Sequence, residues 1–432
     1  MKMSKGRVLV GTAAGALAIG MAANANAQAF YLQEQSVRGQ GRAFSGEAAD
    51  TGVDSLWWNP ASISGMEGSE AAVRASAIIP RGKVVDNGTV IVRPGQAPRS
   101  VGGDPVARNP INKGLLPSFA VAHGFGRLAV GLSVTAPYAF TTNYDSDSWA
   151  RYTADKTKLR TFDIQPSVAF AVTPELHIGG ALNIEHADAS LSNALPNLSP
   201  LLADGHQELK GDGWDLGWSV GAQYRTEAVT LGLAYKSSVK HKLKGTVTTE
   251  GLLGPLAAQN REVDAIATFN TPWMAIGSMR VKATPQLTLN GQVVRYGWEK
   301  FDAIRLGAPL NTAIPENYKN SWSYAGGVDY DVDPQWTVRA GVQYGNTPTR
   351  DGERDARVPD SNRWNFSAGT SYAMSESITV DGAFSYITFK DAPIDRTTAA
   401  YAGTAAQTPI LVDGELQDAS ALVFSLGARV AF

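Results

Sequence analysis

The motif most suggestive of a reaction is the pentapeptide Gly217-Trp-Ser-Val-Gly221, which has the G-x-S-x-G spacing of a hydrolase nucleophile. In that motif, a sharp turn from strand to helix exposes the serine hydroxyl. Here the pentapeptide lies inside a run from Trp214 to Tyr224 in which apolar residues alternate with small or polar ones. Alternation of this kind is typical of a strand. We therefore expect Ser219 to be a small strand residue, and we predict no catalytic residues.

Metal and cofactor patterns are weak. The five histidines show no metal-ligand spacing, and the absence of cysteine excludes thiolate sites and disulfides. Asp145 and Asp147 could contact a cation, although two carboxylates on one loop are more often solvated. We find no phosphate-binding loop, and we predict no cofactor and no metal. The net charge of -2 argues against a nucleic-acid partner, because such proteins carry a basic face or tail.

Two leucine-rich loops indicate a different chemistry, the binding of apolar ligands. Residues 191–204 and 251–258 combine leucine with turn-forming residues, and exposed apolar patches usually have a function. The loops could form a groove that captures a hydrophobic ligand, or they could pack on each other as a cap. The residues assigned to the capture groove are Leu195, Leu198, Leu201, Leu202, Leu252, Leu253 and Leu256.

The elements that would position these residues are alternating strands joined by tight turns. Short polar turns at 172–178 and 332–338 each contain a proline, which pre-sets the backbone for a turn. Short turns alternate with long connections, a pattern typical of bacterial outer-membrane barrels. The polar strand face is mostly small and neutral, which suits a crowded lumen better than the surface of a soluble sandwich. About fourteen strands are expected, near 68–80, 115–124, 127–136, 160–172, 176–190, 211–225, 228–247, 262–283 (with a possible break at Pro272), 287–302, 318–332, 336–346, 362–374, 378–390 and 420–432.

The two ends of the chain carry export signals. Basic residues precede an apolar stretch and the sequence Ala25-Asn-Ala27, which together predict a secretory signal peptide over residues 1–27. Beyond it, no window approaches the roughly 20 apolar residues of a membrane-spanning helix, so strands would have to span. The last strand alternates up to Phe432, and a terminal aromatic residue resembles the signal read by the barrel-assembly machinery. We expect a monomer that contacts outer-membrane lipid, in a barrel formed by residues 68–432.

Residues 28–67 precede the first strand and do not alternate. About forty residues without cysteine cannot form a robust core of their own. The lumen of a barrel this large could hold them as a plug. We call this segment the hatch. Its motif-like residues include Gly41, Arg42, Asn59, Pro60 and Ala61.

Several motifs together resemble the long-chain fatty acid outer-membrane transporter family (FadL/TodX). The resemblance rests on the run Phe30 to Glu47, Asn59-Pro-Ala61, the strand text from Gly211 to Lys240, and Arg357-Val-Pro-Asp-Ser-Asn-Arg363. Each motif is short, but in this order they cover essentially the whole chain after the signal peptide. The family has a fourteen-stranded antiparallel transmembrane β-barrel closed by an N-terminal hatch. The resemblance therefore implies an all-β plugged barrel in the outer membrane of a Gram-negative bacterium.

A ligand pocket inside the barrel is expected from alternation and from the resemblance. Met274 and Ile276 share the parity of Arg280, and Ile387 and Phe389 share that of lumen-facing Asp381, which indicates apolar residues inside a polar lumen. A bulge that swaps faces would give the same pattern. The resemblance adds Phe30 as a pocket residue, and Arg305 with Lys300 nearby as the contact for a ligand head group. A second expected basic position falls near Asp188 or His186, which leaves room for neutral ligands.

The third strand is the exit point in the resembling family, where a kink opens the wall sideways. The corresponding residues here are Pro137, Tyr138, Ala139 and Phe140. Proline cannot donate to the strand ladder, so Pro137 could interrupt pairing. Alternatively, Pro137 merely ends the strand where the loop begins.

The function that follows is passive transport of hydrophobic compounds, with long-chain fatty acids as the first choice of ligand. The steps would be capture by the loops, binding in the pocket, movement of the hatch and release through the wall. An aromatic-hydrocarbon channel of the same family is one alternative, and a general diffusion porin is another. The segment before the barrel argues against an open porin.

Overall fold

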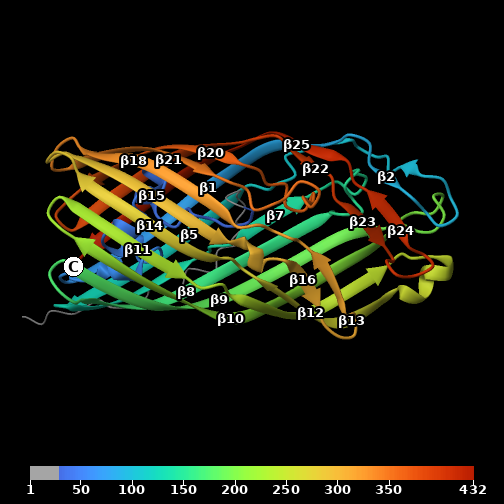
Figure 1. Ribbon diagram of the computed structural model, residues 1–432, viewed down its shortest axis with the longest axis horizontal. Helices are drawn as coiled ribbons and strands as arrows, with labels where there is room; N and C mark the ends of the chain where they lie inside the picture. Colours follow the sequence, from blue (N-terminus) through green and yellow to red (C-terminus); the bar gives the residue numbers. More distant parts are fainter. Residues whose placement is uncertain (1–28) are drawn as a thin grey trace, which may run out of the picture.

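The computed structural model describes residues 29–432, so the proposed signal peptide over residues 1–27 lies outside the described residues. Within that range, no helix is long and apolar enough to cross a membrane. The described chain forms an elongated closed antiparallel barrel with an N-terminal segment inside it (Figure 1). Short turns lie at the end where the C-terminus is found, and long loops at the other (Figure 1).

Fourteen barrel strands surround the lumen within residues 29–432, as the alternation predicted. Six of the fourteen are each divided into two shorter strands. In chain order they are β1 (Ser69–Asp86), β5 (Gly114–Phe125), β6 with β7 (Leu128–Thr135, Ala139–Asn143), β8 (Lys156–Ala171), β9 (Leu176–Leu195), β10 (Gly205–Arg225), β11 with β12 (Val229–Lys236, Lys240–Glu250), β13 with β14 (Arg261–Asn270, Trp273–Lys282), β15 with β16 (Leu287–Gly297, Ala303–Leu306), β17 with β18 (Thr312–Pro315, Ser321–Asp331), β19 (Trp336–Gly345), β20 (Arg363–Ala373), β21 with β22 (Ile378–Phe389, Ala392–Ile394) and β25 (Gly414–Ala431).

Pairing of the first and last strands closes the barrel. β1 and β25 are antiparallel from Glu70 opposite Ala431 to Asp86 opposite Gly414. Both strands extend at their loop ends beyond the predicted limits at residues 80 and 420. The outward positions there are charged or polar, such as Lys83 and Glu415, while Val84 and Leu416 stay buried on the inward side. The expected break at Pro272 is present, between β13 and β14.

The remaining elements lie in the hatch and the loops. β4 (Val106–Arg108) pairs with β1, and a separate four-stranded sheet in the loops contains β2, β3, β23 and β24. The bounds of these elements are β2 Val90–Ile91, β3 Arg99–Ser100, β23 Thr397–Ala400, β24 Thr408–Leu411, α1 Val37–Gly41, and the 3-10 turns η1 Glu47–Ala49, η2 Val53–Ser55, η3 Pro60–Ile63, η4 Gly254–Gln259 and η5 Trp298–Lys300.

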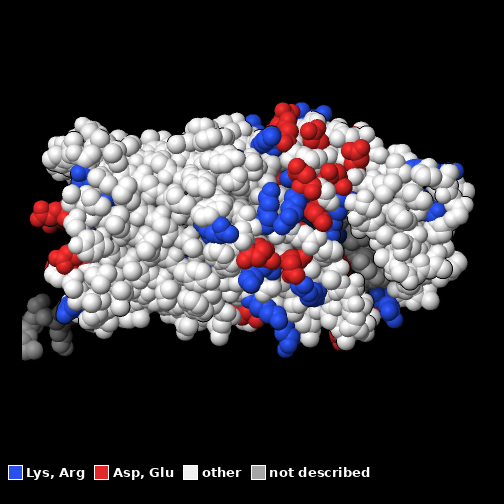
Figure 2. Space-filling model, in the orientation of Figure 1, with Lys and Arg blue, Asp and Glu red and all other residues white. Residues whose placement is uncertain are grey.

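The outer face of the barrel is apolar over a broad band. On β10 the outward side chains include Trp214, Leu216, Trp218 and Val220, all exposed, while Ser219 between them is buried and bonded to Asn183. Figure 2 shows this uncharged band and, beyond it toward the long loops, a belt of Lys, Arg, Asp and Glu. An apolar band edged by aromatic side chains matches the hydrocarbon layer of a membrane.

The hatch fills the lumen and sits against glycines of the barrel wall. A Cβ added to Gly221 would lie 1.9 Å from Oδ1 of Asn59, and one added to Gly341 would lie 2.2 Å from the carbonyl of Arg42. No other residue type leaves room for the hatch at these points. Inward glycines that approach the hatch in this way are Gly131, Gly179, Gly221, Gly232, Gly327, Gly341 and Gly369.

Candidate functional site

An apolar cavity lies at the long-loop end of the lumen, between the barrel wall and the first described residues of the hatch. Its free volume, including the open mouth, is about 680 Å³. Most of the lining is aliphatic or aromatic. The lining residues are Phe30, Phe140, Thr157, Lys158, Leu159, Ala189, Leu191, Leu209, Gly211, Leu243, Ala267, Phe269, Phe301, Ile304, Glu316, Arg357 and Val358.

The cavity forms because the inward side chains of neighbouring strands are apolar near the loops and charged nearer the middle of the barrel. On β8 they run from Leu159 at the loop end to buried Asp163 nearer the middle. On β9 they run from Ala189 to buried Glu185. Leu159 pairs with Ala189 in the ladder, so apolar side chains of adjacent strands meet at one height. The result is an apolar chamber above a polar part of the lumen.

Two ionisable side chains from the loops line this chamber. Arg357 is buried and donates to the carbonyl of Ser192 (3.2 Å) and to Oδ1 of Asn193 (3.2 Å). Burial lowers the pKa of its guanidinium, which still remains charged at neutral pH. Burial raises the pKa of the Glu316 carboxyl to about 8, so this group is mostly neutral at pH 7. Arg357 is therefore the cation that the loops contribute to the chamber, while Lys158 of β8, which also lines it, is paired with Asp188 (2.5 Å).

Phe30 connects the cavity to the hatch. Its ring lies edge-on to those of Trp298 (centroids 4.9 Å apart) and Phe301 (5.1 Å). The backbone N–H of Ala29 donates to Oδ2 of Asp360 at 3.0 Å. The start of the described hatch is thus fixed in the cavity by ring contacts and by a loop carboxylate.

The third barrel strand is interrupted next to Phe30. β6 ends at Thr135 and the strand resumes as β7 at Ala139, so Pro137 breaks the strand and does not end it. β7 pairs with β8. In the described chain, β7 meets the β5 side only through an isolated bridge between Ile111 and Thr142. The wall between β5 and β7 therefore lacks a continuous ladder.

The hatch occupies this interruption with its own backbone. The N–H of Leu32 donates to the carbonyl of Pro137 (2.7 Å), and the N–H of Ala139 donates to the carbonyl of Phe30 (3.0 Å). Tyr31 and Tyr138 face each other as an antiparallel bridge. One short stretch of the hatch thus contacts both the cavity, through Phe30, and the broken strand.

Most of the other residues expected in the pocket lie elsewhere. Met274 and Ile276 are buried in the lumen, as are Ile387 and Phe389, so these side chains point inward, as the alternation predicted. They pack in the barrel core and do not line the cavity. Arg305 is exposed and paired with Asp302, and Lys300 is exposed. Neither is among the residues that line the cavity.

The leucine loops combine both expected arrangements. Leu195, Leu252 and Leu256 are buried together, with Leu198 packed against them. Leu201, Leu202 and Leu253 are exposed. The two loops therefore pack on each other as a cap, and three leucines remain available on its surface.

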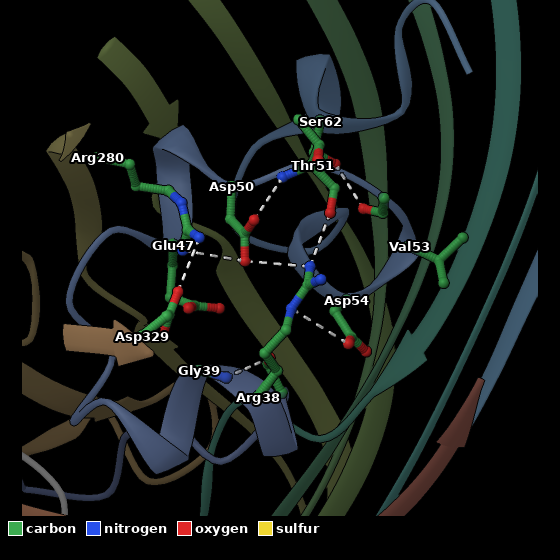
Figure 3. A network of polar contacts seen from close by, with 12 residues as sticks. Arg38, Gly39, Glu47, Asp50, Thr51, Val53, Asp54, Ser62, Arg280 and Asp329 are labelled. Atoms are coloured by element: carbon green, nitrogen blue, oxygen red, sulfur yellow. Dashed lines mark hydrogen bonds and ion pairs between the residues drawn. The ribbon is translucent and has the colours of Figure 1, made fainter. Parts of the chain in front are cut away.

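A buried ionic network holds the hatch to the barrel. Arg42 is fully buried and contacts carboxylates of the hatch, Glu47 (2.6 Å) and Asp50 (2.5 Å). Asp50 also contacts Arg280 of β14 (3.5 Å), which pairs with Asp329 of β18 (2.8 Å). Figure 3 shows Asp50 between Arg38 and Arg280. The network links charged residues of β14 and β18 to one segment of the hatch, which fixes its position in the lumen.

A second carboxylate, Asp54, is held by both ends of the barrel sheet. It contacts Arg74 of β1 (2.5 Å) and Arg429 of β25 (3.2 Å). Burial alone would favour the neutral acid, but the surrounding arginines hold the pKa of Asp54 well below its usual range. The carboxylate is therefore charged at all physiological pH values.

The proline turn of the hatch is fixed by local capping. The side chain of Asn59 accepts from the N–H of Ala61 (2.9 Å) and donates to the carbonyl of Ala48 (2.7 Å). Pro60 takes the first position of η3, where its missing N–H is not needed. Gly41 lies against Gly369 of the wall. The expected hatch residues thus shape the plug and do not contact the cavity.

Comparison with known proteins gives consistent matches over nearly the full chain. Residues 18–432 match the family model of the outer membrane protein transport protein (OMPP1/FadL/TodX). The long-chain fatty acid transport protein of Escherichia coli O6:H1 is 27% identical over 397 residues, covering 83% of this chain and 86% of that protein. The crystal structure of a Pseudomonas aeruginosa FadL homologue superposes with a TM-score of 0.82 at 25% identity, covering 94% of this chain and all of that one. The Ralstonia pickettii toluene transporter TbuX shares the fold, with a TM-score of 0.65 and 17% identity over 92% of this chain and 98% of that chain.

Proposed function

Since this chain belongs to the outer membrane protein transport family OMPP1/FadL/TodX, whose members carry hydrophobic compounds across the outer membrane, we propose that its ligands are long-chain fatty acids. The observation that carries this choice is the buried guanidinium of Arg357 in the wall of an apolar cavity. A fatty acid has an apolar chain and one carboxylate. A guanidinium can bind both oxygens of a carboxylate through parallel hydrogen bonds.

The route that we propose begins at the cap of the two loops. The exposed Leu201, Leu202 and Leu253 would collect the ligand, and the cavity would bind it with its carboxylate at Arg357. Because Phe30 lines the cavity and Leu32 bonds to Pro137, displacement of Phe30 by the acyl chain would loosen the backbone bonds at Pro137. The ligand would then leave sideways between β5 and β7. No energy source is encoded in the chain, so net flux would follow the gradient.

Replacement of Arg357 by glutamine is expected to weaken palmitate binding at least tenfold, since a charge-assisted hydrogen bond contributes about 1.5–3 kcal/mol. Binding of hexadecanol, which has the same chain and no charge, is expected to stay the same. Titration of the purified protein with each ligand measures both affinities. Arg357→Lys should retain part of the palmitate affinity, because it keeps the charge and loses the bidentate geometry.

The matched control is Arg350→Gln, an exposed arginine in the same loop that donates to the carbonyl of Asn317. It should leave both affinities unchanged. Equal losses for palmitate and hexadecanol in Arg357→Gln would mean a structural role only. Unchanged palmitate binding, together with tight binding of toluene, would favour the aromatic-hydrocarbon alternative.

Palmitate binding is also expected to weaken between pH 7 and pH 9. Glu316 has a pKa raised to about 8 by burial, so it is neutral below that pH and negative above it. Its negative charge would then offset Arg357 and repel the ligand. The same shift contributes stability that is present below the unfolded pKa of about 4.3 and is lost as the pH rises through 8. Glu316→Gln should flatten the binding profile; a wild-type profile that is already flat, or a slope that persists in Glu316→Gln, would contradict the role of Glu316.

A further inference from the structure

The outward face of the barrel carries a groove floored by small residues. It crosses β11, β14, β15 and β18, where the outward positions include Ala275, Gly277, Gly291 and Gly326. Two adjoining depressions share Leu233, Gly277 and Val293, with free volumes of about 1050 and 1250 Å³ including their open side. Figure 2 shows the surface over these strands as part of the uncharged band. The groove is therefore in contact with the membrane.

One cation lies at the loop-side end of this groove. Arg295 is outward-facing, two residues before β15 ends, and it lines the same depression as Gly277. Its guanidinium lies 4.9 Å from the ring centroid of Trp322, the residue opposite it on β18. Within residues 29–432, no carboxylate forms an ion pair with Arg295. The partner that the structure gives its guanidinium is the ring of Trp322.

A guanidinium on the lipid face without a carboxylate is placed to bind an anion from outside the chain. Lipid-facing arginine costs up to about 2–4 kcal/mol at the middle of the bilayer and less near the interface. Arg295 lies at the end of the apolar band nearest the long loops, where the head groups of the outer leaflet begin. A tryptophan ring at the same position is typical of that interface. The charge is thus placed where lipid phosphate is available.

We propose that this groove binds a phosphorylated glycolipid of the outer leaflet. One phosphate lies on Arg295, whose fork matches phosphate oxygens. An acyl chain lies below it over Ala275, Gly277 and Gly291. Glycine leaves the depth that a chain needs, since a Cβ at Gly291 would meet no heavy atom within 4 Å. The groove lies on β11 to β18, away from the interruption between β5 and β7, so it is separate from the proposed exit of the transported ligand.

The test is native mass spectrometry of the full purified chain titrated with diphosphoryl lipid A. Arg295→Gln should raise the dissociation constant of the first bound lipid about tenfold, while Arg295→Lys retains much of the affinity. Gly291→Leu, which fills the groove, should weaken binding with the charge still present. Lipid A with both phosphates removed should bind to the wild type as weakly as diphosphoryl lipid A binds to Arg295→Gln.

Two control variants lie on the barrel wall outside the groove. Lys282→Gln removes an exposed charge at the opposite end of β14, and Gly382→Leu fills a lipid-facing glycine on β21. Neither should alter lipid binding, and circular dichroism and melting temperature confirm folding of each variant. Equal affinity of wild type and Arg295→Gln would overturn the proposal, as would equal affinity for the dephosphorylated glycolipid. Dimers that disappear in Gly291→Leu, without bound lipid, would assign the groove to a second copy of the chain and would also overturn it.

Discussion

Oxidation of a Tyr31→Cys/Tyr138→Cys variant is expected to abolish uptake of palmitate, and reduction is expected to restore it. The two residues form an antiparallel bridge flanked by the hydrogen bonds of Leu32 and Ala139. Such a non-hydrogen-bonded pair has Cα atoms about 4.5 Å apart, which a disulfide can span. The bond would tie the hatch to the broken strand, so that the gap between β5 and β7 stays filled. Uptake by cells that lack their own transporter measures the effect.

The reduced form of the same variant is the control for loss of the two tyrosine rings. The chain has no other cysteine, so only this disulfide can form. Binding of palmitate to the oxidised protein should persist, because the cavity is not blocked. Full uptake with the disulfide in place would exclude release through the third strand and would favour a path through the lumen.

Replacement of Arg42 by methionine is expected to convert a silent barrel into a conducting one. Arg42 contacts Glu47 and Asp50 in the lumen, and removal of one partner from a buried ionic contact typically costs about 3–5 kcal/mol. The carboxylates left behind would have to hydrate or protonate, and the hatch would separate from Arg280 on the wall. Single-channel recording in a planar bilayer measures the conductance, and protease cleavage within the hatch provides an independent readout.

Arg305→Met is the matched control, because Arg305 is exposed and its pair with Asp302 lies on the surface. Exposed pairs of this kind contribute little, so this variant should remain silent. If Arg42→Met failed to assemble, Arg280→Met would test the same network from the wall side. A wild-type barrel with steady large conductance would instead support the general diffusion porin. A silent, protease-resistant Arg42→Met protein would show that the network does not hold the hatch.

The fold was predictable because its main signals are local. Alternation identifies strands without knowledge of their partners, and the two breaks at Pro137 and Pro272 follow from the missing N–H of proline. The hatch was predictable from its lack of alternation and from its position before the first strand. Strand ends were the weakest part, because β1 and β25 extend past the membrane into a region where outward positions such as Lys83 and Glu415 are charged, although Val84 and Leu416 stay buried.

The cavity was not predictable in the same way, because it depends on which residues of different strands share one height. Leu159, Leu209 and Leu243 look unremarkable in their own strands, and only the register places them around one space. A signal was present, since inward positions on β8 and β9 change from polar to apolar toward the loops. Arg357 was noted as part of a motif, but its role as the buried cation needs the fold of its loop.

The position of Asp54 has a further consequence for the molecule as a whole. Its carboxylate neutralises Arg74 on the first strand and Arg429 on the last, which are the two strands that meet at the seam of the cylinder. Removal of the hatch would take this carboxylate from Arg74 and leave Arg429 with Asp381 of β21 as its partner. Sealing the cylinder and seating its plug are therefore energetically coupled, and residues 29–67 belong to the architecture of the wall as much as to the gate.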